Sequence, residues 1–442
     1  FRSNFKWRNN SNFRAVKKNI IILFILFTIK SLYPQSSPND ELISMANKSS
    51  NFSSQISFDS EINIESNTLD NNILNKFLFG GTINQELKNI WLSQFRKNNI
   101  VNLELNNGIN FTKNLSSGDL LFSIYDKNHI NLNINKDLLK LILNGNYEYQ
   151  EELLSFNSSN LRVTRFQQYK IGYNLRFKKN QISLAISYLQ GNHNINIVVN
   201  EGSLFTYTNG ESLDLNYNIN SFITDTSSYN FLNSNGNGLA IDFSSTINFN
   251  RSKINFYVDN LGYIKWNRKS INNSIDSTFN FNGITINNFN NLYDSILDYN
   301  DSYSINITDQ NIKYKTYITA DIGINFQQKV TLYNIKKIMF GINSKWQPLL
   351  DNKKLSFKKI RQGIIESNYK PKIYISTEIP YKNFSLLCNL NNGGYTKKTN
   401  LDLGIEINRK FTYIIGSKSI NQILKTNAKQ YFSLYLSIIK DI

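Results

Sequence analysis

The chain has 442 residues, of which 40% are hydrophobic, and a formal net charge of +17. This hydrophobic content is too high for an intrinsically disordered chain and too low for a bundle of membrane-spanning helices. Cys388 is the single cysteine, which excludes a disulfide framework, a cysteine-cluster zinc site and a cysteine-ligated iron–sulfur centre. Imidazole chemistry would have to use His129 or His193, the two histidines. The positive charge raises the question of a nucleic-acid partner.

The N-terminal region carries an almost unbroken apolar run, Ile20–Ile29. Lys17 and Lys18 stand just before it. About ten apolar residues are too few to cross a bilayer as a helix, but they match the core of a secretory signal peptide. We therefore expect residues 1–34 to be a signal peptide, with residues 1–15 as upstream read-through. A buried helix or an amphipathic anchor is the alternative.

Beyond about residue 50, apolar and polar residues alternate with a period of two, which predicts strands with one apolar and one polar face. The clearest alternating segments are 169–177, 182–188, 213–219, 239–243, 401–407 and 432–438. Many candidate segments are about 8–12 residues long, the length that a tilted strand needs to cross a membrane. A soluble sandwich shows the same alternation and stays open as an alternative.

The connections between these segments differ in length. The link Lys178–Asn180 is short, whereas the polar stretches 220–237 and 267–311 are long. Short turns at one rim and long loops at the other are typical of a membrane barrel. We therefore expect residues 35–442 to form an all-β fold, a transmembrane antiparallel β-barrel of about 14 strands (roughly 12–16), with long loops near those two stretches.

Two segments have helical patterns instead. Thr82 and Gln85 have the spacing of a capping box, and the apolar residues that follow recur at helical intervals. Asn135 is positioned to cap a second helix that Gly145 would end. These patterns predict one or two short helices at the rim or in the lumen; simple connecting helices are the alternative.

Several short motifs resemble a known family. They are Gly80-Gly81 with the helix after it, Asp137–Asn146, Tyr169–Tyr173, the predicted turn Tyr188–Gly191 and Leu261–Trp266. Together they resemble a Bacteroidetes outer-membrane barrel family of unassigned function. That family is similar to fatty-acid-transporter-like barrels and to barrel subunits of type IX secretion and gliding. The resemblance covers roughly residues 50–330, implies an outer-membrane barrel and carries over no catalytic residue.

A search for active-site patterns gave weak candidates. A hydrolase would need a Ser–His pair built on His129 or His193, and His193 lies in Gly191–Asn194, which we expect to be a solvated turn. The pair Glu151-Glu152 has no third oxygen ligand nearby.

A calcium loop is the other pattern considered. Asp298, Asn300 and Ser302 have the spacing of its first three ligands, but Tyr303 stands where glycine is needed and Asp309 where a bidentate Glu is expected. A solvated loop is the favoured interpretation.

Two further patterns concern loops. Gly393-Gly394 is expected to form a hairpin turn. One basic cluster is interpreted as a loop facing anionic lipid head groups or as a solvated turn. It consists of Lys353, Lys354, Lys358, Lys359 and Arg361.

The sequence therefore predicts an exported outer-membrane β-barrel that acts as a conduit or as a scaffold subunit of a surface or secretion complex. We expect no catalytic, cofactor or metal site, with membrane lipid and other complex subunits as partners rather than nucleic acid. Residues 1–34 contain seven basic and no acidic side chains, so their removal lowers the net charge from +17 to +10. A secreted soluble β-rich adhesin or surface protein and a membrane-embedded hydrolase remain alternatives.

Overall fold

The computed structural model describes residues 53–442 with ten internal gaps. The gaps are 71–72, 74–75, 77–79, 225–233, 268–269, 282–309, 312, 331–334, 349–356 and 424–428. The predicted signal peptide, the predicted calcium-like loop and Lys353 and Lys354 lie outside the described residues. Within the described ranges, no helix has the length and apolar character that crossing a membrane requires.

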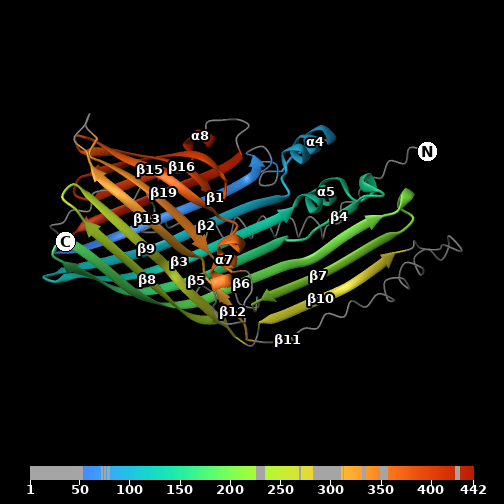
Figure 1. Cartoon of the computed structure of the whole chain (residues 1–442), viewed down its shortest axis with the longest axis horizontal. Coiled ribbons are helices and arrows are strands. Elements are labelled where there is room, and N and C mark those ends of the chain that lie inside the picture. The colour runs from blue at the N-terminus through green and yellow to red at the C-terminus, as the bar shows by residue number, and fades with distance from the viewer. Residues whose placement is uncertain are drawn as a thin grey trace.

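Fourteen strands close into one antiparallel ring (Figure 1). In ring order they are β1 (Ser54–Asp70), β2 (Asn98–Leu115), β3 (Gly118–Asn135), β5 (Asn160–Phe177), β6 (Asn180–Thr206), β8 (Gly236–Asn248), β9 (Ser252–Trp266), β13 (Ala320–Lys329), β14 (Lys337–Trp346), β15 (Lys370–Tyr381), β16 (Phe384–Gly394), β17 (Lys398–Asn408), β18 (Thr412–Ser417) and β19 (Lys429–Asp441). The last strand pairs with the first, from Gln55↔Asp441 to Ile64↔Phe432 and beyond. The predicted barrel of about 14 strands is confirmed.

The two rims of the barrel differ, as the connection lengths predicted. Short turns join β2 to β3, β5 to β6 and β15 to β16 at the rim where Ser54 N donates to Ile442 O over 3.0 Å. The opposite rim carries the long connections and the helices α4 (Gln85–Gln94), α5 (Lys136–Asn144), α7 (Phe357–Glu366) and α8 (Ile420–Ile423). We call these the short-turn rim and the long-loop rim.

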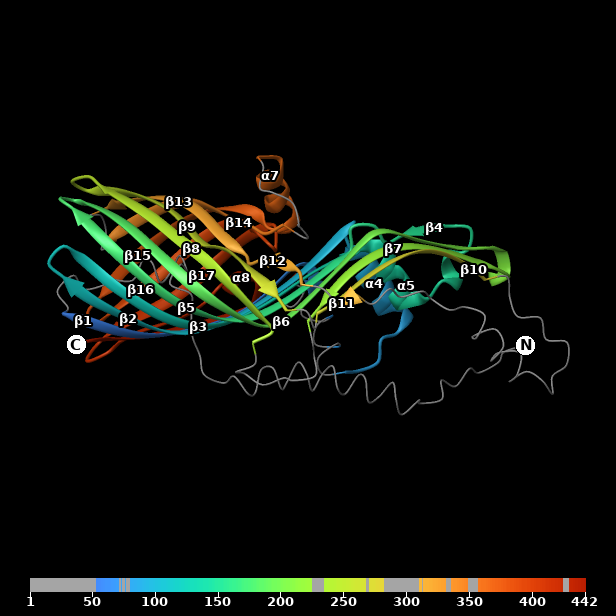
Figure 2. The same ribbon diagram turned by 90° about the horizontal axis from the view of Figure 1, so that it is seen from below.

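A smaller sheet projects from the long-loop rim (Figure 2). The first half of β6 pairs with β8, and its second half pairs with β7 (Leu213–Ile223), which in turn pairs with β10 (Ile271–Phe281). The short strands β4 (Leu153–Ser155) and β11 (Gln310–Asn311) join this sheet, whereas β12 (Lys315–Tyr317) pairs with β9. Segment 213–219 therefore forms a strand outside the ring, and the stretch 267–311, predicted as a long loop, contains β10 and β11 of this sheet. The strand β6 exceeds the expected 8–12 residues because its second half continues beyond the ring.

The outer and inner faces of the ring have opposite polarity. On β5, Ile171 points outward and is 53% exposed, while Gln168 and Lys170 point into the lumen. The same pattern recurs around the ring. Other exposed apolar side chains on the outer face are Ile109, Ile124, Ile186, Ile241, Phe340, Ile342, Ile405 and Leu434.

Four glycines lie directly opposite tyrosines on neighbouring strands. The pairs are Gly108↔Tyr125, Gly323↔Tyr257, Gly341↔Tyr374 and Gly416↔Tyr435. A Cβ atom built on any of these glycines would lie within 2.5 Å of its tyrosine side chain. Each ring therefore covers the glycine opposite it, which is how aromatic residues compensate for the side chain that glycine lacks.

The segment Tyr188–Gly191, predicted as a turn, lies inside β6 instead. The pairing of β5 with β6 passes from Phe166↔Gly191 to Arg165↔His193, so Asn192 is the extra residue of a β-bulge. Gly191 is needed there because a Cβ atom would lie 2.6 Å from a ring carbon of Trp266. The turn prediction was wrong because glycine and asparagine are as frequent in bulges as in turns.

The two predicted helices both form. Asn135 caps α5 by accepting from Asp137 N, and Gly145 ends it with φ 78°, as predicted. The cap of α4 is Asn84, which accepts from Leu87 N over 2.9 Å, rather than Thr82. Both helices lie on the long-loop rim as connecting elements, and they pack together around Trp91.

Candidate functional site

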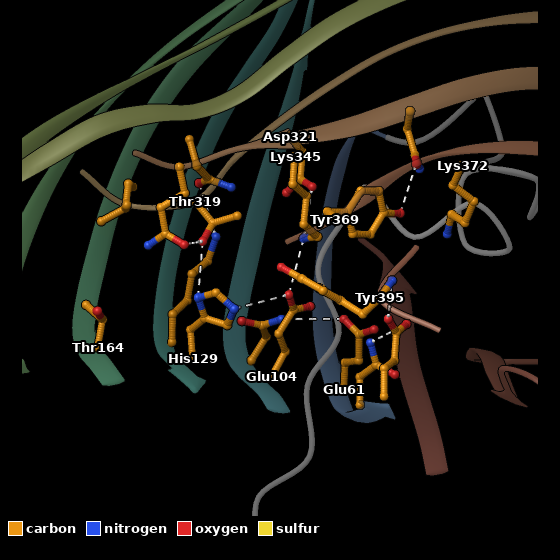
Figure 3. A pocket seen from close by; sticks show the side chains of 18 of the residues that line it. Glu61, Glu104, His129, Thr164, Thr319, Asp321, Lys345, Tyr369, Lys372 and Tyr395 are labelled. Carbon is orange, nitrogen blue, oxygen red and sulfur yellow. Dashed lines mark hydrogen bonds and ion pairs between the residues drawn. The ribbon is translucent and has the colours of Figure 1, made fainter. Parts of the chain in front are cut away.

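The lumen contains a cavity of about 130 Å³, shown in Figure 3. Its ionisable lining residues are Glu61, Glu65, Glu104, Lys127, His129, Asp321, Lys345, Lys372 and Lys418. They come from both sides of the ring, and β5 and β9 add uncharged lining residues such as Thr164 and Asn260, so the cavity is a property of the closed barrel. In the part of the chain that the structure describes, no group of three or more metal-ligating side chains is placed to hold an ion.

Lys345 joins two acidic residues in the cavity. Asp321 and Lys345 are directly opposite on β13 and β14, and the Lys345 Nζ lies 3.0 Å from Asp321 Oδ1. The same Nζ lies 3.3 Å from Oε1 of Glu104 on β2. Since β2 and β14 are second and ninth in the ring of fourteen, this ion pair crosses the lumen.

His129 forms a second contact across the lumen. Its Nε2 lies 2.8 Å from Asn102 Oδ1, and its Nδ1 lies 3.1 Å from Oγ1 of Thr319, which precedes β13. The Thr319 hydroxyl donates to Gln347 Oε1 over 2.9 Å. His129, Thr319 and Gln347 therefore form one chain of polar contacts between β3 and the segments that flank β13 and β14.

Two further lysines form polar contacts in the lumen. Lys127 Nζ donates to Asn260 Oδ1 over 3.1 Å, which connects β3 with β9. Lys418, in the connection from β18 to β19, forms an ion pair with Glu61. Opposite charges are therefore interleaved around the cavity instead of forming one acidic and one basic patch.

Two tyrosines at the long-loop rim, one before β15 and one in the turn from β16 to β17, complete the lining. The rings of Tyr369 and Tyr395 meet edge to face, with centroids 5.0 Å apart, and Tyr369 donates its hydroxyl proton to Asn343 Oδ1. The Tyr395 side chain lies beside Glu104 (Figure 3), and the residue is 1% exposed. Its hydroxyl has no hydrogen-bond partner among the described residues. A buried hydroxyl is normally hydrogen-bonded, so this group is available to a bound polar molecule.

Arg162, on β5, holds the connection from β14 to β15. Its guanidinium donates to Gln347 O over 3.1 Å and to Glu366 O over 2.5 Å. These carbonyls stand at the two ends of the connection that contains α7. A cation at the last turn of a helix also interacts favourably with the helix dipole.

The other candidate residues lie apart from this cavity. His193 lies at the β6 bulge, where its Nδ1 is 3.2 Å from Thr224 Oγ1. The prediction that it lies in a turn was therefore wrong. Glu152 forms an ion pair with Lys140 over 2.6 Å. Partial burial opposes the charge of Lys140, but its hydrogen bonds to Glu152 and Asp137 raise its pKa.

The remaining loop and cysteine predictions have mixed outcomes. Gly393 and Gly394 end β16 with positive φ at the hairpin to β17, which confirms the predicted turn. Cys388 is free and half-buried on β16. Arg361 is exposed on α7, and the rest of its basic cluster has no described side chains.

Residues 42–385 match the model of a family of unknown function, DUF5723. The match covers well over half of the sequence. The chain belongs to the DUF5723 family. No curated protein matches the sequence. The predicted Bacteroidetes origin and the predicted relation to secretion and gliding barrels stay predictions.

Solved barrels are similar to this DUF5723 member over almost their whole length. A TodX deletion mutant described as a monoaromatic hydrocarbon channel has 6% identity and a TM-score of 0.43, covering 93% of this chain and 96% of that one. The P. putida toluene transporter TodX has 7% identity and a TM-score of 0.39, with coverages of 91% and 93%. The translocator domain of autotransporter NalP from Neisseria meningitidis has 6% identity and a TM-score of 0.34, with coverages of 90% and 90%.

Proposed function

We propose that this DUF5723 protein is an integral outer-membrane barrel that forms a gated conduit for small polar or charged solutes. One observation carries the proposal: the ring is closed, apolar side chains cover its outside, and ionised side chains fill its inside. A soluble protein has the opposite arrangement, whereas a transmembrane barrel presents apolar residues to lipid and polar residues to its lumen. Export would use the predicted signal peptide, residues 1–34.

The chemistry of the cavity supports a polar solute. The free hydroxyl of Tyr395 and the interleaved lysines and carboxylates offer donors and acceptors within one small volume. The Glu104–Lys345 ion pair crosses the lumen at the cavity. A solute that passes has to break this ion pair and replace it with its own contacts to Glu104 and Lys345, so the pair is suited to act as the gate.

Membrane placement is tested by extraction. We expect membranes from cells that express the chain to retain it in carbonate and in urea, and to release it in detergent. Release without detergent would overturn the barrel proposal and favour the secreted soluble alternative. Sequencing the N-terminus of the extracted protein tests the signal peptide.

Conduction is tested in planar bilayers with the purified full chain. We expect the double variant E104Q/K345M to raise single-channel conductance or open probability, because it removes the charged contact across the lumen. A matched variant, K382M, removes a lysine at the short-turn rim and should conduct like the wild type. Equal conductance of all three proteins would contradict a gate at Glu104–Lys345.

Absence of catalysis is also part of the proposal. We expect the double variant H129A/H193A to show the same background lipase and esterase activity as the wild type. A wild-type activity that this variant loses would favour the embedded hydrolase instead.

A role as a scaffold subunit is a second candidate because of the sheet that projects from the long-loop rim. β6, β7 and β10 extend beyond the ring and carry polar side chains such as Asn216, Asn218 and Asp276. Crosslinking from Asp276→Cys in intact outer membranes should capture a defined partner if this sheet is a docking element. A label that stays on the monomer alone would argue against the scaffold role.

A further inference from the structure

Two lysines face each other on the outer surface of the barrel. Lys265 on β9 and Lys315 on β12 are directly opposite in the antiparallel pairing. Among the described residues, no carboxylate forms an ion pair with either of them. Like charges directly opposite on neighbouring strands are destabilising, so this pair needs a compensating negative charge from elsewhere.

Two positions along each strand, on the same face, lies a pair of tyrosines that contacts the lysines. Tyr263 and Tyr317 are also directly opposite, with ring centroids 6.5 Å apart. Lys315 Nζ lies 3.9 Å from the centroid of Tyr263 and donates to the Tyr317 hydroxyl over 3.2 Å. Lys265 Nζ lies 5.8 Å from the same Tyr263 centroid. Both ammonium groups therefore lie near one tyrosine ring rather than pointing apart.

The position of the pair on the wall indicates its partner. Leu261 is exposed on the outer face, and along β9 it is followed on that face by Tyr263 and then by Lys265. Leu239, on the neighbouring β8, is directly opposite Tyr263 and also exposed. Apolar residues, then tyrosines, then lysines is the order found where a membrane barrel passes from hydrocarbon to the head groups. This boundary lies toward the long-loop rim.

We infer that Lys265 and Lys315 bind the phosphate of an anionic lipid in the leaflet at the long-loop rim. Each ammonium group can donate to a phosphate oxygen, and charge-assisted hydrogen bonds of this kind are stronger than neutral ones. Leu239 and Leu261 would contact the acyl chains of the same lipid. The inference rests on the membrane placement proposed above, and it adds a specific lipid site to it.

The test uses the purified full chain in phosphatidylcholine vesicles with or without phosphatidylglycerol. We expect phosphatidylglycerol to raise the thermal unfolding temperature of the wild type, and high salt to reduce this shift. K265Q and K315Q should each weaken lipid binding about tenfold, because each removes one charged donor. K382Q/K410Q, which removes two lysines at the short-turn rim, should keep the wild-type shift.

The charge-reversal variant K315E separates lipid binding from folding. It replaces the repelling lysine pair with a Lys–Glu pair, so we expect it to unfold at the same temperature as the wild type, or higher, in phosphatidylcholine alone. It should nevertheless lose the response to phosphatidylglycerol. An equal response in wild type, K315E and K382Q/K410Q would overturn the lipid site.

Two further measurements identify the source of the phosphate and separate failure of the lipid site from failure of the membrane proposal. Inorganic phosphate added to phosphatidylcholine vesicles should not reproduce the shift, and an equal shift would overturn the choice of a lipid. Resistance of the vesicle-bound chain to carbonate extraction is measured in every sample. If extraction resistance persists while the lipid response is absent, the site is wrong and the barrel proposal stands; if the chain is extracted, the barrel proposal itself fails.

Discussion

Glu104 and Lys345 are 241 positions apart in the sequence and on opposite sides of the ring, yet their charged groups lie 3.3 Å apart in the lumen. The pair joins the half of the wall built from the first strands to the half built from the later ones. Asp321 extends it into a three-residue group around one ammonium. The proposed gate and the contact that joins the two halves of the wall are therefore the same ion pair.

The first prediction concerns the cost of breaking this contact. Lys345→Met leaves Glu104 and Asp321 without their shared cation, and removing one partner of a buried ion pair costs about 3–5 kcal/mol. Urea unfolding in detergent micelles should show that loss for Lys345→Met. The double variant E104Q/K345M should lose less than the single variant, and the turn variant Lys382→Met should be nearly neutral. Additive losses would show that the two residues are not coupled.

Arg162 should control the segment that contains α7. Arg162→Gln removes the hydrogen bonds to Gln347 O and Glu366 O, while the strand pairing of β5 does not depend on the guanidinium. We expect faster hydrogen exchange at Ser367 and Asn368 and unchanged exchange in β5. Arg165→Gln is the control, because Arg165 lies three residues further along β5 and forms an ion pair with Asp126 instead. Uniform loss of protection across the wall would instead mean that Arg162 supports the whole barrel.

The outer face gives a prediction about lipid. Ile171 points outward from the middle of β5, where an arginine in contact with hydrocarbon costs about 2–4 kcal/mol. Ile171→Arg should reduce the folding free energy in phospholipid vesicles by that amount, whereas Ile171→Leu should change it little. If Ile171→Arg is tolerated as well as Ile171→Leu, this face does not contact hydrocarbon.

Lys397 gives a prediction about pH. It lies in the turn from β16 to β17, and burial together with the charges of Arg96 and Lys370 lowers its pKa. The folded state thus binds this proton less strongly than the unfolded state. Stability should rise with pH through the window between the lowered pKa and the ordinary value near 10.5.

Lys397→Asn should remove that rise, because asparagine does not titrate, and it should stabilise the protein modestly at neutral pH and low salt. Lys382, which also has positive φ in a turn, is the matched control, since Lys382→Asn reproduces the backbone effect of the change. The difference between the two variants, measured by thermal unfolding across pH and salt, is the electrostatic part. No difference at low salt would contradict the repulsion.

The sequence predicted the wall of the barrel well because alternation is a local property. A strand such as 401–407 shows its two faces within a few residues, and the helix caps at Asn135 and Gly145 are equally local. The count of about fourteen strands was confirmed for the ring, although five shorter or projecting strands lie outside it.

The cavity could not be predicted in the same way. Alternation indicates that Glu104, Lys345 and Arg162 face the lumen, but not which charges meet, because that depends on ring closure and on the stagger of the strands. The bulge at Asn192 was not predicted for a related reason. Glycine and asparagine indicate an irregular backbone, but they do not show whether the chain reverses direction or continues as a strand. The position of β7 outside the ring depends on β6 having two successive neighbours, which no local pattern reveals.

The seam between β1 and β19 has a consequence for how the protein is made. Other neighbours in the wall are joined by comparatively short connections, whereas this pairing joins Ile64 to Phe432 and has nearly the whole described chain as its loop. Contacts between such distant segments form late and slowly during folding. Until they form, β1 and β19 each present a row of unpaired backbone groups, which is a template for aggregation. Correct folding therefore depends on covering the edges of β1 and β19 until the two strands pair and close the ring.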